Sequence, residues 1–382
     1  MNIFVISRGY PESHDPQWGI FEASQAKALR ALGHKVTILA VDGRTRFYPR
    51  KIGIKHLKEE GAYIYHLFPF SLLSFSPRLV TRVNQWMMRR LFRKVAVKEG
   101  TPEVIYAHYL NNMQNCMMIK PEFDGVIVGL EHWSELLRPK VDETVDITAR
   151  KVYRKLDKVL TVSPALRDSL KKHYGVNATY VPNMVADEFI NASRVRKPGD
   201  RFEFCAIGRL VEIKNFDLLI KAAAMLRDKG VDFSVKIIGS GPEQSDLIRL
   251  ITELQLEGRV KLLGMRTRNE IIEILNSCDA LVLPSDYETF GVVLIEAMAM
   301  GLPVIACNAG GPVDIIDESN GILIPVHDTG ALADAMQYMA ENFNKYDCEK
   351  IATECANKYS GENVARKVVE IFQELISKKK AK

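Results

Sequence analysis

The sequence predicts an α/β protein with two doubly wound, parallel sheets that face a central cleft. With 382 residues, the chain exceeds the roughly 150 residues that a single domain commonly has. Short β-branched and apolar runs alternate along it with helix-length amphipathic segments, which is the pattern of repeated βα units. These runs are apolar throughout, as expected of parallel strands buried on both faces. Two Rossmann-like domains account for this pattern, and ligands of such sheets bind at the carboxyl ends of the strands.

Twelve strands are expected, six in each half of the chain. They cover residues 3–7, 36–40, 63–67, 104–109, 126–130 and 159–163, and then residues 204–207, 235–239, 260–263, 280–284, 304–307 and 321–325. Between the halves, residues 191–200 form a polar stretch with the composition of a linker. We place the domain boundary near residue 185, so that the first domain spans residues 1–185.

Composition and charge narrow the classes of function. Apolar residues make up 47% and charged residues 26%, which excludes a disordered or collagen-like chain. Residues 1–185 hold 28 Lys and Arg against 17 Asp and Glu, a balance of +11, whereas the rest holds 24 against 30, a balance of −6. The total of +5 is too small to indicate a nucleic-acid partner. The basic first half favours an anionic partner, either a membrane surface or a phosphorylated acceptor.

Cysteine spacing and hydropathy indicate the cellular compartment in which the protein is expected. The six cysteines show no CxxC spacing and lie mostly in apolar runs. This is typical of reduced core residues in a cytosolic protein and not of a zinc site or a disulfide framework. We see no secretion signal, and no run of about 18 apolar residues that would span a membrane. We therefore expect a cytoplasmic protein, peripheral on the inner face of the membrane where its basic half binds lipid.

The most informative segment covers residues 284–301. It follows an expected strand and continues into a helix that opens at Phe290–Gly291. Free N–H groups and the positive end of the helix dipole at such an N-terminus suit an anionic diphosphate. Glu288 precedes the helix and Glu296 lies within it, and a carboxylate can accept hydrogen bonds from two sugar hydroxyls. Ordinary roles also remain open, for Glu288 as a partner of the helix dipole and for Glu296 as a solvated helical acid.

Two basic residues flank the first βα turn of the second domain. The expected strand 204–207 is followed by Arg209, and Lys214 lies further along the same turn. Rossmann-like sheets receive phosphates at this turn. A guanidinium and an ammonium group there suit a diphosphate whose negative charge grows as a bond breaks. Two basic residues in a loop are ordinary in themselves, and their place after a strand favours the functional interpretation.

Four motifs in the second half occur in a distinctive order. They are Gly208-Arg209-Leu210 with Lys214, Gly239-Ser240-Gly241-Pro242, Glu288-x7-Glu296 and Ala309-Gly310-Gly311-Pro312. Together they resemble the glycosyltransferases of family 4, which are retaining enzymes of the GT-B fold. The first half, through Gly9-Tyr10-Pro11 and residues 17–34, is similar to members that build bacterial surface polysaccharides. The resemblance implies that residues 1–185 bind the acceptor and residues 186–361 the nucleotide-sugar donor, with a helix at about 362–382 packing back on the first domain.

The resemblance also implies contacts with each part of the donor. The residues that would make them are Arg209 and Lys214 for the diphosphate, Glu296 for the ribose, Glu288 for the transferred sugar, the backbone of Phe290, Gly291, Val292 and Val293 for phosphate and sugar, Met265 for the nucleobase, and Gly19 for close approach to the phosphates. Arg209, Lys214 and Glu288, the charged groups near the reacting bond, would also take part in catalysis. No metal ion or other cofactor is expected, because no Asp-x-Asp follows a strand and the two cations with the helix dipole would compensate the leaving group's charge.

His132 is the remaining catalytic candidate. It follows the expected strand 126–130, at a place where the family often has a histidine, and would orient the sugar or stabilise an oxocarbenium-like state. His108, also at a strand end, competes for this role, and a structural role is open for either. The resemblance further implies retention at the anomeric carbon by front-face attack, with the departing phosphate accepting the proton of the acceptor.

Residues 76–98 combine basic and large apolar side chains and predict a helix with Ser76 as its cap. The composition is typical of an interfacial amphipathic helix, although a core-packed helix with a solvated basic face has the same composition. We expect this segment to dock on an anionic leaflet through Arg89, Arg90, Arg93 and Lys94, with added apolar contact from Trp86, Met87 and Phe92 if these three share the outward face.

Three functions stay open. The first is a retaining glycosyltransferase that moves a sugar from a nucleotide sugar, with UDP preferred over GDP, to a lipid-linked or polysaccharide acceptor in cell-surface glycan synthesis. The second is a non-catalytic protein of the same fold that binds nucleotide sugars. The third is a dinucleotide-dependent oxidoreductase, which needs Gly-x-Gly-x-x-Gly after an early strand, whereas residues 239–244 lack the third glycine.

Overall fold

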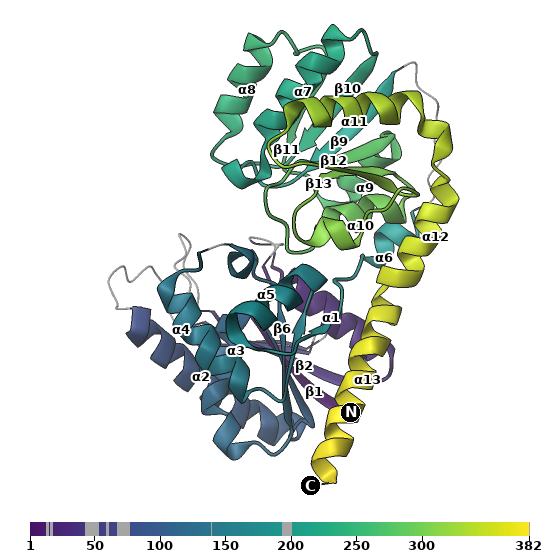
Figure 1. Ribbon diagram of the computed structural model, residues 1–382. Helices are drawn as coiled ribbons and strands as arrows, with labels where there is room; N and C mark the ends of the chain where they lie inside the picture. The colour runs from purple at the N-terminus through teal and green to yellow at the C-terminus, as the bar shows by residue number, and fades with distance from the viewer. Residues whose placement is uncertain are drawn as a thin grey trace. The chain divides into compact units, whose positions relative to one another are not determined.

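The structure is a computed structural model that describes residues 1–12, 15, 18–42, 53–58, 61–66, 77–138, 140–192 and 201–381 (Figure 1). The chain divides into two compact units. The first comprises Met1–Met184 together with Gly361–Lys382, and the second comprises Val185–Ser360. Each unit contains one sheet with crossover helices, so the predicted α/β class with two Rossmann-like domains is confirmed.

The first unit is built on an eight-stranded sheet with the strand order β3-β4-β2-β1-β5-β6-β7-β8. Its strands are β1 (Asn2–Ser7), β2 (Lys35–Asp42), β3 (Gly53–Leu57), β4 (Ala62–His66), β5 (Val104–His108), β6 (Val126–Glu131), β7 (Lys158–Thr161) and β8 (Thr179–Tyr180). All neighbouring strands are parallel except β3 and β4, which are antiparallel. The central strands are almost completely buried, which explains their continuous apolar sequences.

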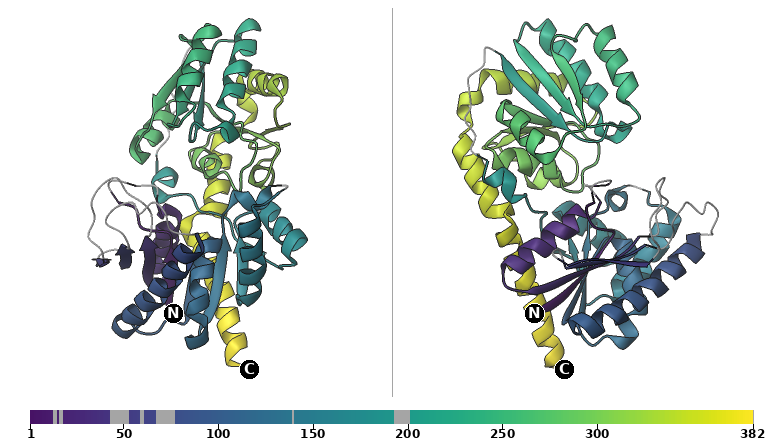
Figure 2. Two further views of the ribbon diagram at one scale, coloured as in Figure 1. Left: turned by 90° about the vertical axis from the view of Figure 1, so that its left-hand side faces the viewer. Right: turned by 180° about the vertical axis from the view of Figure 1, so that it is seen from behind.

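The described residues of this unit contain six α-helices. They are α1 (Ile20–Ala31), α2 (Pro77–Glu99), α3 (Leu110–Asn115), α4 (Glu143–Val152), α5 (Pro164–Tyr174) and α13 (Gly361–Lys380). Local sequence sets their ends, as in α5, where the Ser163 hydroxyl accepts the N–H of Leu166 and Gly175 closes the helix at φ 66°. The C-terminal helix α13 packs along α1 (Figure 2), and its buried Phe372 meets Tyr106 of β5 with ring centroids 5.1 Å apart. The last helix of the chain thus completes the first core.

The second unit has a six-stranded, fully parallel sheet with the order β11-β10-β9-β12-β13-β14. Its strands are β9 (Phe202–Ile207), β10 (Phe233–Ile238), β11 (Val260–Gly264), β12 (Ala280–Leu283), β13 (Val304–Cys307) and β14 (Gly321–Ile324). Its helices are α6 (Asp187–Ile190), α7 (Phe216–Asp228), α8 (Gln244–Glu253), α9 (Arg268–Asn276), α10 (Val292–Ala299), α11 (Thr329–Glu341) and α12 (Cys348–Tyr359). This is the 3-2-1-4-5-6 order of a doubly wound sheet.

The twelve predicted strands all coincide with observed strands over most of their lengths. The predicted helix at residues 76–98 is α2, although its expected cap, Ser76, lies outside the described residues. Two strands were not predicted. β3 is an antiparallel edge strand of half-buried and exposed residues, and β8 has only two residues, so neither produces an apolar run.

All six cysteines lie in the described residues, none of them forms a disulfide, and five are buried. This confirms the prediction of core residues outside any disulfide framework for all but the half-buried Cys348. Within the described part of the chain, no helix combines the length and the apolar character needed to cross a membrane.

Candidate functional site

The second sheet changes direction between β9 and β12. From these two strands it extends through β10 and β11 on one side and through β13 and β14 on the other. The loops after such neighbouring strands diverge, and ligands of open α/β sheets bind at this switch point. The loop after β9 covers residues 208–215, and the loop after β12 covers residues 284–291. The predicted residues Arg209, Lys214 and Glu288 all lie on these two loops.

Lys214 and Glu288 form an ion pair between the loops. The contact joins Lys214 Nζ to Glu288 Oε1, with side chains that are 22% and 16% exposed. Lys214 ends a short 3₁₀ turn, Glu212–Lys214, which begins the crossover to α7. Arg209 is exposed, and among the described residues its guanidinium makes no hydrogen bond or ion pair. The switch point therefore offers one paired ammonium and one guanidinium that an anion can engage.

Asn215 and Asp286 clamp the same two loops together. Asn215 Nδ2 donates to Asp286 Oδ1 and, at 3.2 Å, to the carbonyl of Pro284. The backbone N–H of Asp286 donates to the carbonyl of Ile213 at 3.0 Å. Asn215 is buried and has a φ of 48°, a left-handed conformation that Asn tolerates better than most residues. His327, from the loop after β14, places Nε2 at 3.3 Å from Asp286 Oδ1.

Sequence reasoning missed this clamp, because Asn and Asp beside a strand end read as ordinary turn residues. The only signal was the position of Asn215, directly after the predicted phosphate ligand. Because the clamp residues neighbour the ion pair in both loops, the clamp fixes the separation at which that pair forms.

Helix α10 begins at the end of the second loop. Gly291 precedes it at φ 88°, and Phe290 is buried beneath the turn. The N–H of Gly311 donates to the carbonyl of Glu288 at 2.8 Å, and a Cβ on Gly311 would overlap the backbone of Phe290. The Ala309–Pro312 motif thus supports the loop from behind. The N–H groups of Val292 and Val293 lack a carbonyl four residues earlier in the helix, which leaves them for a ligand.

The Gly239–Pro242 motif has a structural reason. A Cβ on Gly239 would overlap the carbonyl oxygen of Gly208, and one on Gly241 would overlap that of Leu210. Two backbone hydrogen bonds of 3.0 Å join these turns, from Gly208 N–H to the carbonyl of Ile238 and from Leu210 N–H to the carbonyl of Ser240. The glycines therefore allow the loop after β10 to pack directly against the loop that carries Arg209.

Glu296 and Met265 lie on separate elements of the second unit. Glu296 is half-buried on α10, where burial raises the pKa of its carboxyl to about 7, opposed by the positive charge of Arg268. No described residue donates a hydrogen bond to this carboxylate. Met265 follows β11 and is 60% exposed. Both side chains are therefore accessible to a ligand without breaking a hydrogen bond or ion pair with the described residues.

The first sheet changes direction between β1 and β5, and Gly19 belongs to the loop after β1. Gly19 precedes α1 at φ 80°, and a Cβ there would overlap the carbonyl of Gly9. Trp18 Nε1 donates to the carbonyl of Arg8 at 2.8 Å, and Arg8 Nε lies 3.0 Å from the fully buried Glu22 carboxylate. Gly19 is thus needed where two backbone segments touch, while its approach to donor phosphates stays a prediction.

The two competing histidines of the first unit form a pair. Nδ1 of His108, the last residue of β5, lies 3.1 Å from Nε2 of His132, which follows β6. His108 is fully buried and His132 is 8% exposed. Glu131, also buried, accepts the backbone N–H groups of His132 and Trp133 at 3.0 Å and the Tyr153 hydroxyl at 2.8 Å, and burial raises its pKa to about 7. The loop that carries His132 is therefore held by the contact with His108 and by the hydrogen bonds to Glu131.

Two sequence families match the chain, one in each half. The model described as Glycosyltransferase Family 4 matches residues 23–189, and the one described as Glycosyl transferases group 1 matches residues 187–353. Both models describe glycosyltransferases, and together they span residues 23–353 of this chain. The second match contains all the candidate residues of the switch point in the second unit, and the first contains His108 and His132.

Similar proteins carry related names. The D-inositol 3-phosphate glycosyltransferase of Corynebacterium kroppenstedtii is 25% identical over 315 residues, which cover 77% of this chain and 65% of the relative. The enzyme of that name from Corynebacterium urealyticum is 33% identical over 178 residues, covering 44% and 42%. The Escherichia coli protein WcaL, whose name refers to colanic acid biosynthesis, is 33% identical over 165 residues, covering 41% and 40%. The chain thus matches less than two thirds of the length of each.

Solved glycosyltransferase structures share the fold along almost the whole chain. Sucrose-phosphate synthase from Thermosynechococcus elongatus superposes with a TM-score of 0.78 at 20% identity, covering 99% of both chains. HepE of Anabaena in complex with UDP gives a TM-score of 0.73 at 20% identity, covering 98% of this chain and 100% of that one. The predicted GT-B fold is confirmed.

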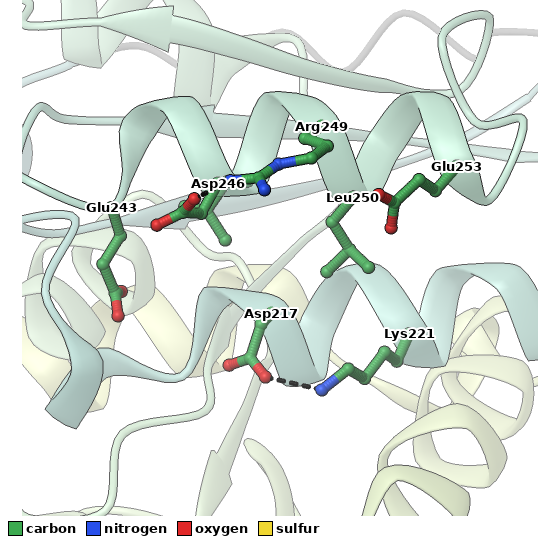
Figure 3. Close-up of a pocket in the computed structure, with 8 residues that line it drawn as sticks. Asp217, Lys221, Glu243, Asp246, Arg249, Leu250 and Glu253 are labelled. Atoms are coloured by element: carbon green, nitrogen blue, oxygen red, sulfur yellow. Dashed lines mark hydrogen bonds and ion pairs between the residues drawn. The ribbon is translucent and has the colours of Figure 1, made fainter.

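A hollow between α7 and α8 holds none of the predicted residues (Figure 3). Four carboxylates and two cations line it, together with Leu247 and Leu250: Asp217, Glu243, Asp246, Glu253, Lys221 and Arg249. Asp217 pairs with Lys221 at 2.7 Å, and burial together with the neighbouring acids raises the pKa of Glu243. Its excess of negative charge disfavours a diphosphate.

The predicted lipid-docking residues divide into two groups. Arg89 and Arg93 both pair with Glu122, and these hydrogen bonds lower the pKa of its carboxyl to about 2. Trp86 is 51% exposed, with the Arg90 guanidinium 5.6 Å from its ring centroid. Met87 and Phe92, in contrast, are buried in the core, so the expectation that they add outward apolar surface is wrong. The helical period explains this, because both lie on the stripe that faces the sheet.

Proposed function

We propose that the protein is a retaining glycosyltransferase that moves a sugar from a nucleoside-diphosphate sugar to a lipid-linked or polysaccharide acceptor in cell-surface glycan synthesis. The observation that carries the proposal is the Lys214–Glu288 ion pair at the switch point of the second sheet, with Arg209 exposed beside it. It sets a cation for phosphate next to a carboxylate for sugar hydroxyls. The matches to two glycosyltransferase family models support the same reaction class.

In this proposal the donor is held by the second unit. Arg209 and Lys214 bind the diphosphate together with the N–H groups at the start of α10, since each adds positive charge at one switch point. Glu288 accepts hydrogen bonds from the transferred sugar, and Glu296 accepts them from the ribose. Met265 lies against the nucleobase. UDP is the preferred nucleotide and GDP the next, and HepE, a structural neighbour, was solved in complex with UDP and glucose.

Chemistry in this proposal depends on stabilising the leaving group. As the bond between the anomeric carbon and the phosphate oxygen breaks, negative charge grows on the nucleoside diphosphate. Lys214, Arg209 and the N-terminus of α10 are oriented before the reaction and meet that charge, so a bound metal ion is not required. The acceptor hydroxyl attacks from the same face and passes its proton to the departing phosphate, which preserves the anomeric configuration. His132 contacts the transferred sugar.

We propose that the acceptor is presented at an anionic lipid surface that the first unit contacts through α2. The exposed residues of this helix combine basic and apolar side chains along its outward stripe: Leu79, Arg82, Trp86, Arg90, Arg93, Lys94, Val97 and Lys98. Such a stripe suits the boundary between headgroups and acyl chains. The name of WcaL, which refers to colanic acid biosynthesis, supports a role in the synthesis of a glycan.

A nucleotide panel tests the proposal. The unfolding temperature is measured with UDP, GDP, ADP and NAD, and a ligand at a hundredfold excess over its Kd stabilises the folded state by about 2.7 kcal/mol. We expect the largest rise with UDP, release of UDP from a UDP-sugar in the presence of acceptor, and full activity in excess EDTA. Stabilisation by NAD alone would favour an oxidoreductase. Stabilisation by UDP without any release would favour a non-catalytic sensor, and loss of activity with EDTA would contradict the metal-free reaction.

A further inference from the structure

Arg8 and Tyr109 meet at the switch point of the first sheet. Arg8 directly follows β1 and Tyr109 directly follows β5, the two neighbouring strands from which the sheet extends in opposite directions. The Arg8 guanidinium lies 3.7 Å from the centroid of the Tyr109 ring and 4.9 Å from that of the Trp18 ring. Ligands of open α/β sheets bind at such a place. The first unit therefore presents a cation, packed on aromatic rings, where a ligand is expected.

A buried carboxylate fixes the direction of the Arg8 side chain. Glu22, on α1, is completely buried, and its Oε1 accepts the backbone N–H of Arg8 at 3.3 Å and the side-chain Nε–H at 3.0 Å. Withdrawal of Arg8 would leave this carboxylate buried without a counter-charge, which is costly. Trp18 Nε1 also donates to the carbonyl of Arg8 at 2.8 Å. The backbone and the side chain of Arg8 are thus both held in place.

The backbone of Tyr109 has a conformation that a bulky residue rarely adopts, with a φ of 69° and a ψ of 147°. Its N–H donates to the carbonyl of Leu130 at 2.9 Å, and its ring also stacks on His132 with centroids 4.6 Å apart. Backbone strain of this kind persists where the surrounding contacts demand it, and it is concentrated at binding sites. This strained residue is also the one whose ring contacts the Arg8 guanidinium.

Arg8 supplies the positive charge beside the two histidines. Burial lowers the pKa of His108 to about 4 and that of His132 well below its usual value, so both rings are uncharged near neutral pH. The charge of Arg8 contributes to both shifts. Glu22 accepts the Nε–H of Arg8, and no described residue bonds the two Nη groups of this side chain, which is 25% exposed. The Nη groups form the end of the planar fork that matches an oxyanion.

We propose that Arg8 binds an oxyanion of the acceptor, a phosphate or a carboxylate group, through its two Nη groups. The proposal rests on the proposed function, in which the first unit receives the acceptor. Both oxyanions accept two parallel hydrogen bonds from a guanidinium, and such charge-assisted bonds are roughly twice as strong as those between neutral groups. The charge balance of +11 in residues 1–185 also favours an anionic ligand on this unit.

Two changes at Arg8 separate anion binding from a role in folding. Arg8→Lys keeps a positive charge opposite the buried Glu22 but lacks the fork. Arg8→Gln combined with Glu22→Gln removes both charges, so that no buried carboxylate is left without a partner. Arg150→Lys is the matched control, because Arg150 also pairs with a carboxylate, Asp146 at 2.8 Å, and lies 5.4 Å from the ring centroid of Tyr174. The unfolding temperature establishes that each variant is folded.

Isothermal titration calorimetry measures the binding of pyrophosphate and of glucuronate to the full-length protein, with glucose as the uncharged control. The protein is first saturated with UDP, so that the donor site does not take up the added anion. We expect an anion to bind the wild type and Arg150→Lys equally well, and to bind the double variant at least about tenfold more weakly. Arg8→Lys should also bind it more weakly than the wild type. A preference for pyrophosphate would indicate a phosphate-bearing acceptor, and a preference for glucuronate would indicate an acidic sugar.

Three results distinguish failure of this proposal from failure of the proposed function. Anion binding that is absent from the wild type, or unchanged in both Arg8 variants, would overturn the proposal. A loss of UDP affinity in Arg8→Lys at unchanged anion binding would also overturn it, because Arg8 would then contact the donor. Absence of sugar transfer in the wild type would refute the proposed function, while the titrations still decide whether Arg8 binds an oxyanion.

Discussion

Lys214 and Glu288 pair across the switch point of the second sheet although 74 residues separate them in sequence. Each is the natural partner of a different half of a nucleotide sugar, because the ammonium suits phosphate and the carboxylate suits sugar hydroxyls. In the absence of a donor they hold each other in place. In the proposed function, the diphosphate gives Lys214 a second anion, and Glu288 accepts hydrogen bonds from the sugar.

The clamp formed by Asn215 and Asp286 next to this pair leads us to expect different losses in the free energy of unfolding for two substitutions of Asn215. Asn215→Gly removes the hydrogen bonds to Asp286 and Pro284 but keeps the left-handed conformation, so the free energy of unfolding should fall by about 1–3 kcal/mol. Asn215→Ala should lose about 1–2 kcal/mol more, because a Cβ is strained at positive φ. Urea unfolding measures both. Equal stability of the two variants, or no loss in Asn215→Gly, would contradict the clamp.

Glu296 predicts a pH dependence of nucleotide binding. Its pKa is raised to about 7, so its proton leaves as the pH rises through 7, and only the ionised carboxylate accepts both ribose hydroxyls. UDP affinity should therefore increase from pH 6 to pH 8, by up to about tenfold per unit below the pKa. Glu296→Gln should lack the increase in UDP affinity that ionisation of Glu296 causes. Isothermal titration calorimetry of both proteins separates this increase from the pH dependence that the phosphate of UDP itself contributes.

The same pKa shift has a consequence for stability. A carboxyl whose pKa is raised on folding stabilises the protein below its unfolded value and loses that contribution as the pH rises through 7. Wild type should lose unfolding free energy relative to Glu296→Gln between pH 5 and pH 8. Parallel profiles of the two proteins would mean that the carboxyl titrates normally.

We expect lipid binding by helix α2 to depend on particular basic side chains. Arg90 and Lys94 are exposed, and each basic residue near an anionic surface contributes about 1 kcal/mol. Reversing both to Glu should weaken sedimentation with vesicles of roughly one third phosphatidylglycerol by more than tenfold. Lys171→Glu with Lys172→Glu on α5 makes the same change of charge elsewhere in the unit and should have little effect. Equal losses in both double variants would indicate a response to net charge alone.

The salt dependence of vesicle binding tests the role of the exposed cations of α2 independently. Exposed charges are screened within about 8–10 Å at physiological ionic strength, so binding should weaken as salt rises. Binding that is insensitive to salt would point to insertion of Trp86 and its apolar neighbours instead.

Much of the fold was readable in the sequence because parallel strands buried on both faces are continuous apolar runs. The ends of those runs also drew attention to Arg209, Lys214 and Glu288, since all three lie on loops that follow strands. Their mutual contact could not be read, because it depends on which strands are neighbours. The order that sets β9 beside β12 is a tertiary property of the chain.

Other errors had more local causes. Met87 and Phe92 were grouped with Trp86 by composition, whereas the helical period separates them, and this signal was present in the sequence. The pairing of His108 with His132 was missed for another reason. Each histidine was weighed alone as a candidate, and only the register of β5 against β6 makes them partners.

The single-turnover rate of Lys214→Ala at saturating donor tests the account most directly. Loss of one oriented donor to a growing anion costs about 3–4 kcal/mol in the transition state, so the rate should fall roughly 100- to 1,000-fold with a smaller change in donor affinity. Lys221→Ala is the matched control, since it removes an exposed ammonium paired with Asp217 on α7 of the same unit, and it should keep the wild-type rate. A near-normal rate in Lys214→Ala, or an equal fall in Lys221→Ala, would contradict the assignment of the switch point as the donor site.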